Sequence, residues 1–190
     1  VDRAVLQTGH LYGRLNCYLS DAVKAFPDRL WALSMVDEWK VDQPGQLLEL
    51  DRSVNDLGLH GLWFQSSNLK QNKRTEPVDA PVFWPFWNRV RELGIPVFWF
   101  VTSIEPGVDS YMEELSAFDR WTKLYPEVPV MFTHGLPLFR FMTNGKIEIP
   151  EEAWKPLEAA NVVTEILLPI FQGAIWEYPF VEAHYVIREY

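Results

Sequence analysis

The residue whose type and position could most readily do chemistry is His134, which ends the apolar run Val130-Met-Phe-Thr133 and is followed by Gly135. Near neutral pH an imidazole can act as a general acid or base, or as a metal ligand. The glycine after it would let a ligand approach the backbone closely. The alternative is a histidine that only satisfies the core through a hydrogen bond to the backbone. The sequence weights these two interpretations about evenly.

Polar residues of other types follow neighbouring apolar runs. Gln65 ends one run and Thr102 follows the next, so their side chains could bind polar groups of a substrate or satisfy backbone groups of a loop. Asp37 and Glu38 follow an earlier run. Adjacent residues on an extended chain point to opposite sides, so a solvated loop is favoured here over a pair of catalytic carboxylates.

The other histidines carry weaker signals. His10 lies at a possible strand end between two glycines, His60 lies near the start of a strand, and His184 lies in an expected terminal helix. The sequence has no HxH or HExxH pair, no glycine-rich phosphate-binding loop and no GxSxG elbow. Cys17, the single cysteine, lies within an expected helix and is a poor nucleophile candidate. No residue is therefore assigned as a metal ligand.

Six strand-like apolar runs must position these residues. A helix-like segment separates each run from the next, and the runs begin near Arg3, Leu30, Leu59, Pro96, Pro129 and Asn161. Alternating strands and helices predict a parallel α/β sheet, in which active sites lie at the carboxyl ends of the strands. Right-handed crossovers give either a barrel or an open doubly wound sheet. The flavodoxin-like form of the open sheet is disfavoured because phosphate-binding loops are absent.

Caps and prolines mark the helices between the runs. The expected helices cover about residues 16–26, 44–57, 81–93, 109–126, a segment from residue 150, and residues 177–190. Residues 67–77 and 136–149 are expected to be loops, the second with a turn at Asn144-Gly145.

Composition excludes several classes of protein. A chain of 190 residues that is 48% apolar can bury a large core as one domain, which we expect to cover residues 1–190. The net charge of −9 argues against a nucleic-acid partner, and no apolar run is long enough to cross a membrane. A single cysteine fits a reducing cytosol, so we expect a cytoplasmic protein. Nine Trp and twelve Phe indicate a core, a cleft or an interface built from aromatic rings.

Four motifs occur in a particular order along the chain: Pro27-Asp-Arg-Leu30, Leu57-Gly-Leu-His-Gly-Leu62, Glu92-Leu-Gly-Ile-Pro-Val97 and Phe132-Thr-His-Gly135. With them, nearly the whole chain resembles the amidohydrolase-related family, in the branch that includes aminocarboxymuconate-semialdehyde decarboxylase and γ-resorcylate decarboxylase. The resemblance implies a distorted TIM barrel with one divalent metal, usually zinc. It also implies hydrolysis or non-oxidative decarboxylation of small carboxylated or aromatic substrates, and a homodimer.

The resemblance also assigns roles to residues. His134 matches the sixth-strand histidine, which polarises metal-bound water or acts as an acid or base. The family's HxH pair would lie before Val1 and its metal aspartate after Tyr190, and Phe100 stands where the fifth-strand metal histidine belongs. The divalent metal of the intact family is therefore expected to be absent from this segment alone.

The leading hypothesis is an incomplete TIM-barrel-like (β/α) repeat of about six parallel strands with flanking helices, a piece of a longer protein that starts here at Val1 without methionine. It would be a metal-dependent hydrolase or decarboxylase of small carboxylated or aromatic compounds if the full-length chain supplies the missing ligands. His134 is its catalytic candidate. Gln65, Thr102 and Phe100 are its substrate-binding candidates, and a cleft shared by His134, Gln65 and Thr102 is expected. The alternative is a degenerate, metal-free barrel that binds a ligand or stabilises a partner.

Overall fold

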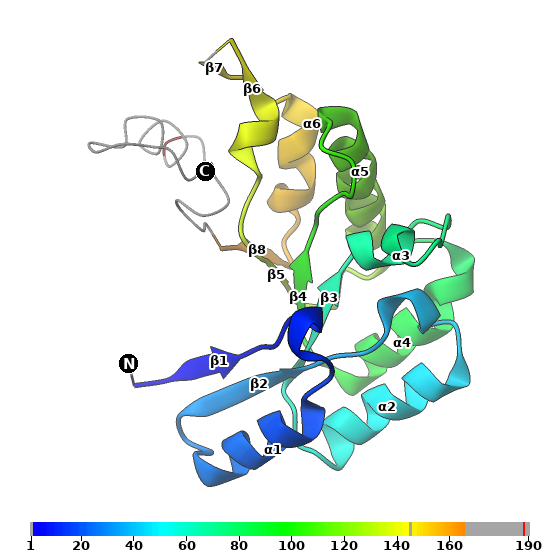
Figure 1. Cartoon of the computed structure of the whole chain (residues 1–190), viewed down its shortest axis with the longest axis vertical. Coiled ribbons are helices and arrows are strands. Elements are labelled where there is room, and N and C mark those ends of the chain that lie inside the picture. Colours follow the sequence, from blue (N-terminus) through cyan, green and yellow to red (C-terminus); the bar gives the residue numbers. More distant parts are fainter. Residues whose placement is uncertain (1, 145, 166–187, 189–190) are drawn as a thin grey trace.

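Six parallel strands form the sheet of this protein. The computed structural model describes residues 2–144, 146–165 and 188 (Figure 1). The strands are β1 (Ala4–Leu6), β2 (Leu30–Ser34), β3 (Gly61–Gln65), β4 (Val97–Phe100), β5 (Val130–Phe132) and β8 (Val162–Thr164). All six lie where the apolar runs predict strands.

The order of the strands in the sheet follows their order in the chain. The sheet runs β1-β2-β3-β4-β5-β8, and every neighbouring pair is parallel. A doubly wound sheet reverses its strand order at a switch point, whereas a barrel does not. The structure is therefore a half-barrel, as expected from the sequence, and the flavodoxin-like alternative is wrong.

Helices follow the outer side of this sheet (Figure 1). The longer ones are α1 (Asn16–Ala25), α2 (Pro44–Asn55), α4 (Trp84–Leu93) and α5 (Val108–Leu124), and all four match predicted segments. The short helices are α3 (Ser67–Gln71), α6 (Glu151–Trp154), and the 3-10 turns η1 (His10–Tyr12), η2 (Glu38–Lys40), η3 (Pro81–Phe83), η4 (Leu138–Phe141) and η5 (Lys155–Glu158). Within the described residues, no helix is long and apolar enough to cross a bilayer.

Two predicted loops contain more structure than expected. Residues 67–77 begin with α3, which is anchored by the buried side chain of Leu69. Residues 136–149 contain the antiparallel hairpin of β6 (Met142–Thr143) and β7 (Lys146–Ile147). Asn144 has a left-handed φ of 51° there, which confirms the predicted turn. The helix expected over residues 177–190 lies outside the described residues, apart from Arg188.

Aromatic rings fill the space between the sheet and the outer helices. Trp87 on α4, Trp99 on β4 and Trp121 on α5 are each 0% exposed. Trp99 stacks on Trp87 with ring centroids 5.1 Å apart, and Trp121 meets Trp99 edge-on at 4.7 Å. Each such ring buries about 150–250 Å². These three tryptophans therefore serve the core.

A glycine brings two parallel strands into register. A Cβ on Gly61 would lie 2.9 Å from the Pro96 carbonyl oxygen and 2.9 Å from Cδ2 of Leu33. That oxygen also accepts a 2.9 Å hydrogen bond from the backbone N–H of Leu62. Gly58, in the preceding turn, has a φ of +70°, which favours glycine. The Leu57–Leu62 motif thus needs glycine at two positions for different reasons: Gly58 for its positive φ, and Gly61 for the lack of space for a Cβ.

Candidate functional site

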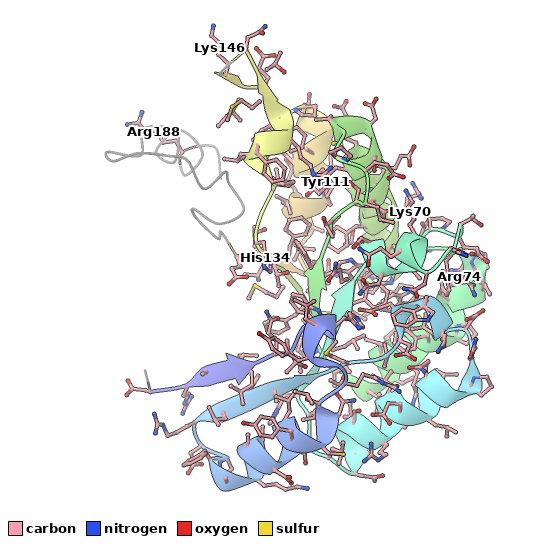
Figure 2. The ribbon with its side chains drawn as sticks, viewed as in Figure 1. Lys70, Arg74, Tyr111, His134, Lys146 and Arg188 are labelled. Atoms are coloured by element: carbon pink, nitrogen blue, oxygen red, sulfur yellow. The ribbon has the colours of Figure 1, made fainter. Side chains whose placement is uncertain are left out.

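His134 follows β5 at the carboxyl edge of the sheet in a left-handed conformation (Figure 2). Its φ is 73° and that of Gly135 is 70°. A residue other than glycine rarely adopts this conformation, which costs about 1–3 kcal/mol and recurs at functional sites. In this turn the half-buried imidazole contacts Trp63 and Phe100 and does not continue the alternating side-chain directions of the strand.

Two aromatic rings flank this imidazole. Phe100 stacks on it with centroids 4.5 Å apart, and Trp63 meets it edge-on at 6.3 Å. Burial lowers the pKa of His134 because it disfavours the charged ring, while the Glu165 carboxylate and a backbone hydrogen bond oppose the shift. The environment thus favours a neutral imidazole, which can accept a proton.

Glu165 is a site residue that sequence reasoning missed. In the sequence, the apolar run Leu167-Leu-Pro-Ile170 has nothing ionisable at its end. The strand ends earlier, at Thr164, so Glu165 is the residue at its carboxyl end. Its Oε2 accepts a 3.3 Å hydrogen bond from the backbone N–H of His134. Residues 167–170 lie outside the described part of the chain.

The inner side of the half-barrel is apolar and hollow. Leu33, Met35 and Trp63 form a buried cluster on it, against which Phe98 and Phe100 pack. A cavity of about 230 Å³ lies along the same side and is lined by Val5, Gln7, Leu33, Phe98, Met131, Thr133 and Glu165. His134, Gln65 and Thr102 are not among these lining residues, so their shared cleft stays a prediction.

The predicted substrate-binding residues are near neighbours at the ends of β3 and β4. Gln65 and Phe100 are partners in the register of these strands, and Phe100 contacts His134. The Gln65 side-chain amide donates to Ser67 Oγ at 2.9 Å. The carbonyl of Thr102 accepts a 3.4 Å hydrogen bond from Ser66 Oγ. Of the three predicted substrate-binding residues, Phe100 is therefore the one with a ring contact to the His134 imidazole.

Glu38 is buried, and the predicted solvated loop is wrong for this residue. Its exposure is 0%, and its Oε1 accepts hydrogen bonds of 3.2 Å from the backbone N–H of Gln65 and 3.2 Å from Asn68 Nδ2. His10 Nε2 lies 2.8 Å from Glu38 Oε2 and 3.0 Å from Oε1. The hydrogen bond to Glu38 raises the pKa of His10 against the opposing effect of burial. In the sequence, His10 carries only a weaker signal than His134.

The described residues do not by themselves fit a protein-held metal ion. They contain no group of three or more His, Cys, Asp or Glu side chains that could hold one. At the ends of β5 and β8 they offer the imidazole of His134 and the carboxylate of Glu165. Phe100 presents only carbon beside them.

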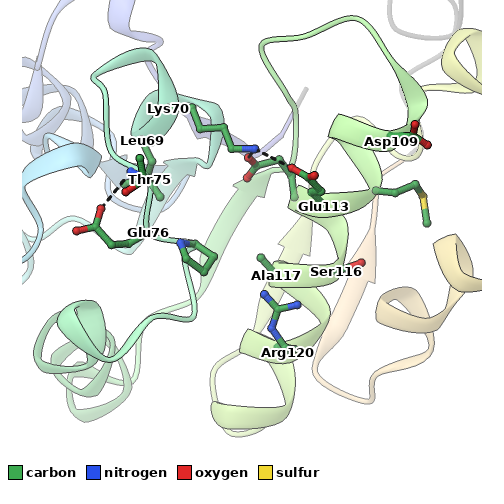
Figure 3. A pocket seen from close by; sticks show the side chains of 12 residues that line it. Leu69, Lys70, Thr75, Glu76, Asp109, Glu113, Ser116, Ala117 and Arg120 are labelled. Carbon is green, nitrogen blue, oxygen red and sulfur yellow. Dashed lines mark hydrogen bonds and ion pairs between the residues drawn. The ribbon is translucent and has the colours of Figure 1, made fainter.

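A larger groove of about 500 Å³ lies between the segment after β3 and α5 (Figure 3). Both of its cationic side chains, Lys70 and Arg120, are paired with carboxylates, and Lys70 Nζ lies 2.9 Å from Glu114 and 3.3 Å from Glu113. Arg120 makes a two-point contact with Asp79, at 2.7 and 3.0 Å. These ion pairs connect the loop to the helix, and the groove contains none of the predicted site residues.

Comparison with known proteins agrees with the fold and with the resemblance. Residues 1–166 match the family model described as Amidohydrolase. No curated protein matches the sequence. An uncharacterised TIM-barrel protein from Bordetella bronchiseptica superposes with a TM-score of 0.55 and 18% identity, over 78% of this chain and 47% of that one.

Two decarboxylases have the same fold. 2,6-Dihydroxybenzoate decarboxylase from Rhizobium gives a TM-score of 0.55 and 17% identity, over 82% of this chain and 65% of that one. 5-Carboxyvanillate decarboxylase from Novosphingobium aromaticivorans, complexed with manganese and 4-hydroxy-3-methoxy-5-nitrobenzoic acid, gives 0.60 and 17%, over 96% and 62%. The chain spans about half to two thirds of the length of these structures. At this identity the likeness establishes the fold.

Proposed function

The chain belongs to the amidohydrolase family, and on that basis we propose that it is part of a hydrolase or non-oxidative decarboxylase of small carboxylated aromatic compounds. The fold it shares with two aromatic-acid decarboxylases supports the choice of compounds. We also propose that residues 1–190 form a single domain and that the protein is a cytoplasmic homodimer.

The observation that carries the proposal is the left-handed backbone of His134, whose imidazole lies against the rings of Phe100 and Trp63. A left-handed histidine at a strand end is retained against its conformational cost, which supports a functional role. The flat faces of Phe100 and Trp63 beside it suit an aromatic ring, because such rings attract one another by stacked and edge-on contacts.

Each reaction in this class needs one proton to be moved. Decarboxylation breaks the bond between the ring and its carboxylate, releases CO₂ and places a proton on the ring carbon. Hydrolysis requires a proton to leave the attacking water. We assign this proton to His134, whose neutral form can take it up and whose protonated form can return it. Phe100 would hold the substrate ring, and Gln65 and Thr102 would contact its oxygen substituents.

A divalent cation belongs to the proposal. Solved relatives were crystallised with manganese, and a bound cation would polarise substrate oxygens as a Lewis acid. Zinc is the expectation drawn from the family. In the proposed enzyme, ligands from residues other than the described ones must complete its coordination.

The test is turnover of 2,6-dihydroxybenzoate and 5-carboxyvanillate by the purified full-length protein, with and without added Mn²⁺ or Zn²⁺, followed by chromatography of the products. His134→Asn is the informative variant, because asparagine tolerates a left-handed φ and keeps the turn. We expect a loss of about 10²–10⁴-fold in kcat, the usual contribution of a general acid or base.

His60→Asn is the matched control. His60 stacks on Trp31 just before β3, at the opposite end of that strand from Gln65. Activity within a few-fold of wild type is expected for the control. The proposal fails if wild-type protein turns over neither acid with either metal, or if His134→Asn retains full activity. A protein that binds an aromatic acid without turnover or metal would instead be the degenerate binder.

A further inference from the structure

A second histidine lies at the carboxyl edge of the sheet, on β1's side of the site. His10 stands in η1 after β1, and Glu38 stands in η2 after β2. The imidazole Nε2 lies 2.8 Å from a carboxylate whose side chain is 1% exposed, while the histidine side chain itself is 27% exposed. The pair therefore joins a fully buried anion to a ring that reaches the surface.

The surroundings of Glu38 fix the orientation of that ring. A carboxylate removed from water is costly unless it is paired and hydrogen-bonded. Here Oε1 accepts from the Gln65 backbone and from Asn68, each at 3.2 Å. The imidazole is the third donor to the same carboxylate. Nε2–H must consequently point at Glu38.

Orientation by Glu38 leaves the other ring nitrogen available. Within the described part of the chain, Nδ1 of His10 makes no hydrogen bond. In the protonated ring both nitrogens are donors. The charged groups nearest the ring are Glu38, Asp37 and Arg14, and together the two carboxylates favour the protonated form. Trp39 covers one side, with ring centroids 5.7 Å apart.

A chain of direct contacts joins His10 to His134. Glu38 accepts the backbone N–H of Gln65, Gln65 pairs with Phe100 across β3 and β4, and Phe100 stacks on His134. The imidazoles of His10 and His134 are thus linked through these contacts along the carboxyl edge of the sheet. Burial lowers the pKa of His134 and so favours its neutral form, while the hydrogen bond to Glu38 raises the pKa of His10 and so favours its protonated form. Such divergent environments are typical of groups with separate roles in one site.

We propose that His10 is a ligand-binding residue, which Glu38 orients so that its free ring N–H donates to an anionic oxygen of the substrate, such as a carboxylate. This inference rests on the proposed function, because it assumes an aromatic acid in the half-barrel. It adds a specificity-determining residue that selects for the anionic group and takes no part in proton transfer.

The test compares two probes by calorimetric titration at pH 6: 2,6-dihydroxybenzoate, and resorcinol, which is the same ring without the carboxylate. For His10→Gln we expect at least a tenfold weaker affinity for the acid, because hydrogen bonds to charged groups are among the stronger ones, and an unchanged affinity for resorcinol. His10→Lys, which restores a positive charge, should recover part of the loss.

His60→Gln is the control, and circular dichroism of each variant checks the fold. An unchanged affinity of His10→Gln for the acid overturns the inference and leaves the proposed function standing. An equal loss of affinity for both probes also overturns the inference, because His10 would then support the structure of the site and would not recognise the carboxylate. If wild-type protein binds neither probe, the proposed substrate class fails and takes the inference with it.

Discussion

Replacing Gly61 by alanine tests the packing that sets the register of β3 against β4. The added methyl group would lie 2.9 Å from the Pro96 carbonyl oxygen, well inside van der Waals contact. This oxygen cannot retreat freely, because it accepts the Leu62 backbone N–H at 2.9 Å. The second close atom, Cδ2 of Leu33, lies in the buried inner cluster. Relief therefore requires the strands to separate or Leu33 to leave its rotamer.

The magnitude follows from these two contacts. Overpacking a tight interior costs about 1–3 kcal/mol, and a clash with a hydrogen-bonded backbone atom belongs at the upper end. With a urea m-value of about 2–3 kcal/mol/M for a chain of this size, the midpoint of unfolding should fall by about 1 M. Tryptophan fluorescence is a suitable probe, because Trp99 lies on β4 itself.

Gly45→Ala is the matched control for the same chemical change. Gly45 lies in the first turns of α2, and a Cβ there would meet nothing within 4 Å. Alanine should be neutral or stabilising at this position, by up to about 1 kcal/mol. The steric argument is refuted if Gly61→Ala unfolds at the wild-type urea concentration, or if both variants shift the midpoint equally.

Two further predictions concern the core and the charged pair. Trp99→Leu should lower the free energy of unfolding by about 3 kcal/mol, because the ring is fully buried among other aromatic rings. Trp31→Leu, at a side chain that is 56% exposed, should change it by less than about 0.5 kcal/mol. Urea titration of both variants measures the two changes, and equal effects would contradict the prediction. The stability contributed by the His10–Glu38 contact should be fully present below the ordinary histidine pKa of about 6.5 and should be lost as the pH rises through the raised pKa of His10. The urea midpoint of unfolding, measured from pH 5 to 9, should therefore fall with rising pH. His10→Gln should make that midpoint less dependent on pH.

Much of the fold could be predicted because its signals are local. Each apolar run became a strand, and prolines and glycines marked the ends of α1, α2, α4 and α5 correctly. The predicted capping side chains were wrong, because none of these helices has a side-chain hydrogen bond at its N-cap. The five-residue helix α3 was missed because its sequence is mostly polar and too short for a periodic pattern. Burial of Leu69 and the hydrogen bond from Asn68 to Glu38 anchor it, and both require the finished fold.

The candidate site was predicted in part, for a related reason. His134 and Phe100 stand out through their places at strand ends, and the structure brings their rings together. Glu38 could not be identified, because its partners His10, Gln65 and Asn68 lie 27 to 30 residues away in the chain. Nothing in its own neighbourhood distinguishes a buried carboxylate from a solvated one.

The sequential order of the strands also has a consequence for how the chain can fold. Each strand pairs with the next one along the chain, so partners such as Ala4 and Leu30, or Val97 and Val130, are only about 30 residues apart. Closing a loop costs entropy that grows slowly with its length, so each ladder closes at a similar modest cost. During synthesis every new strand emerges when its neighbour has already been made. The sheet can therefore assemble in the order in which it is translated, one strand and one helix at a time.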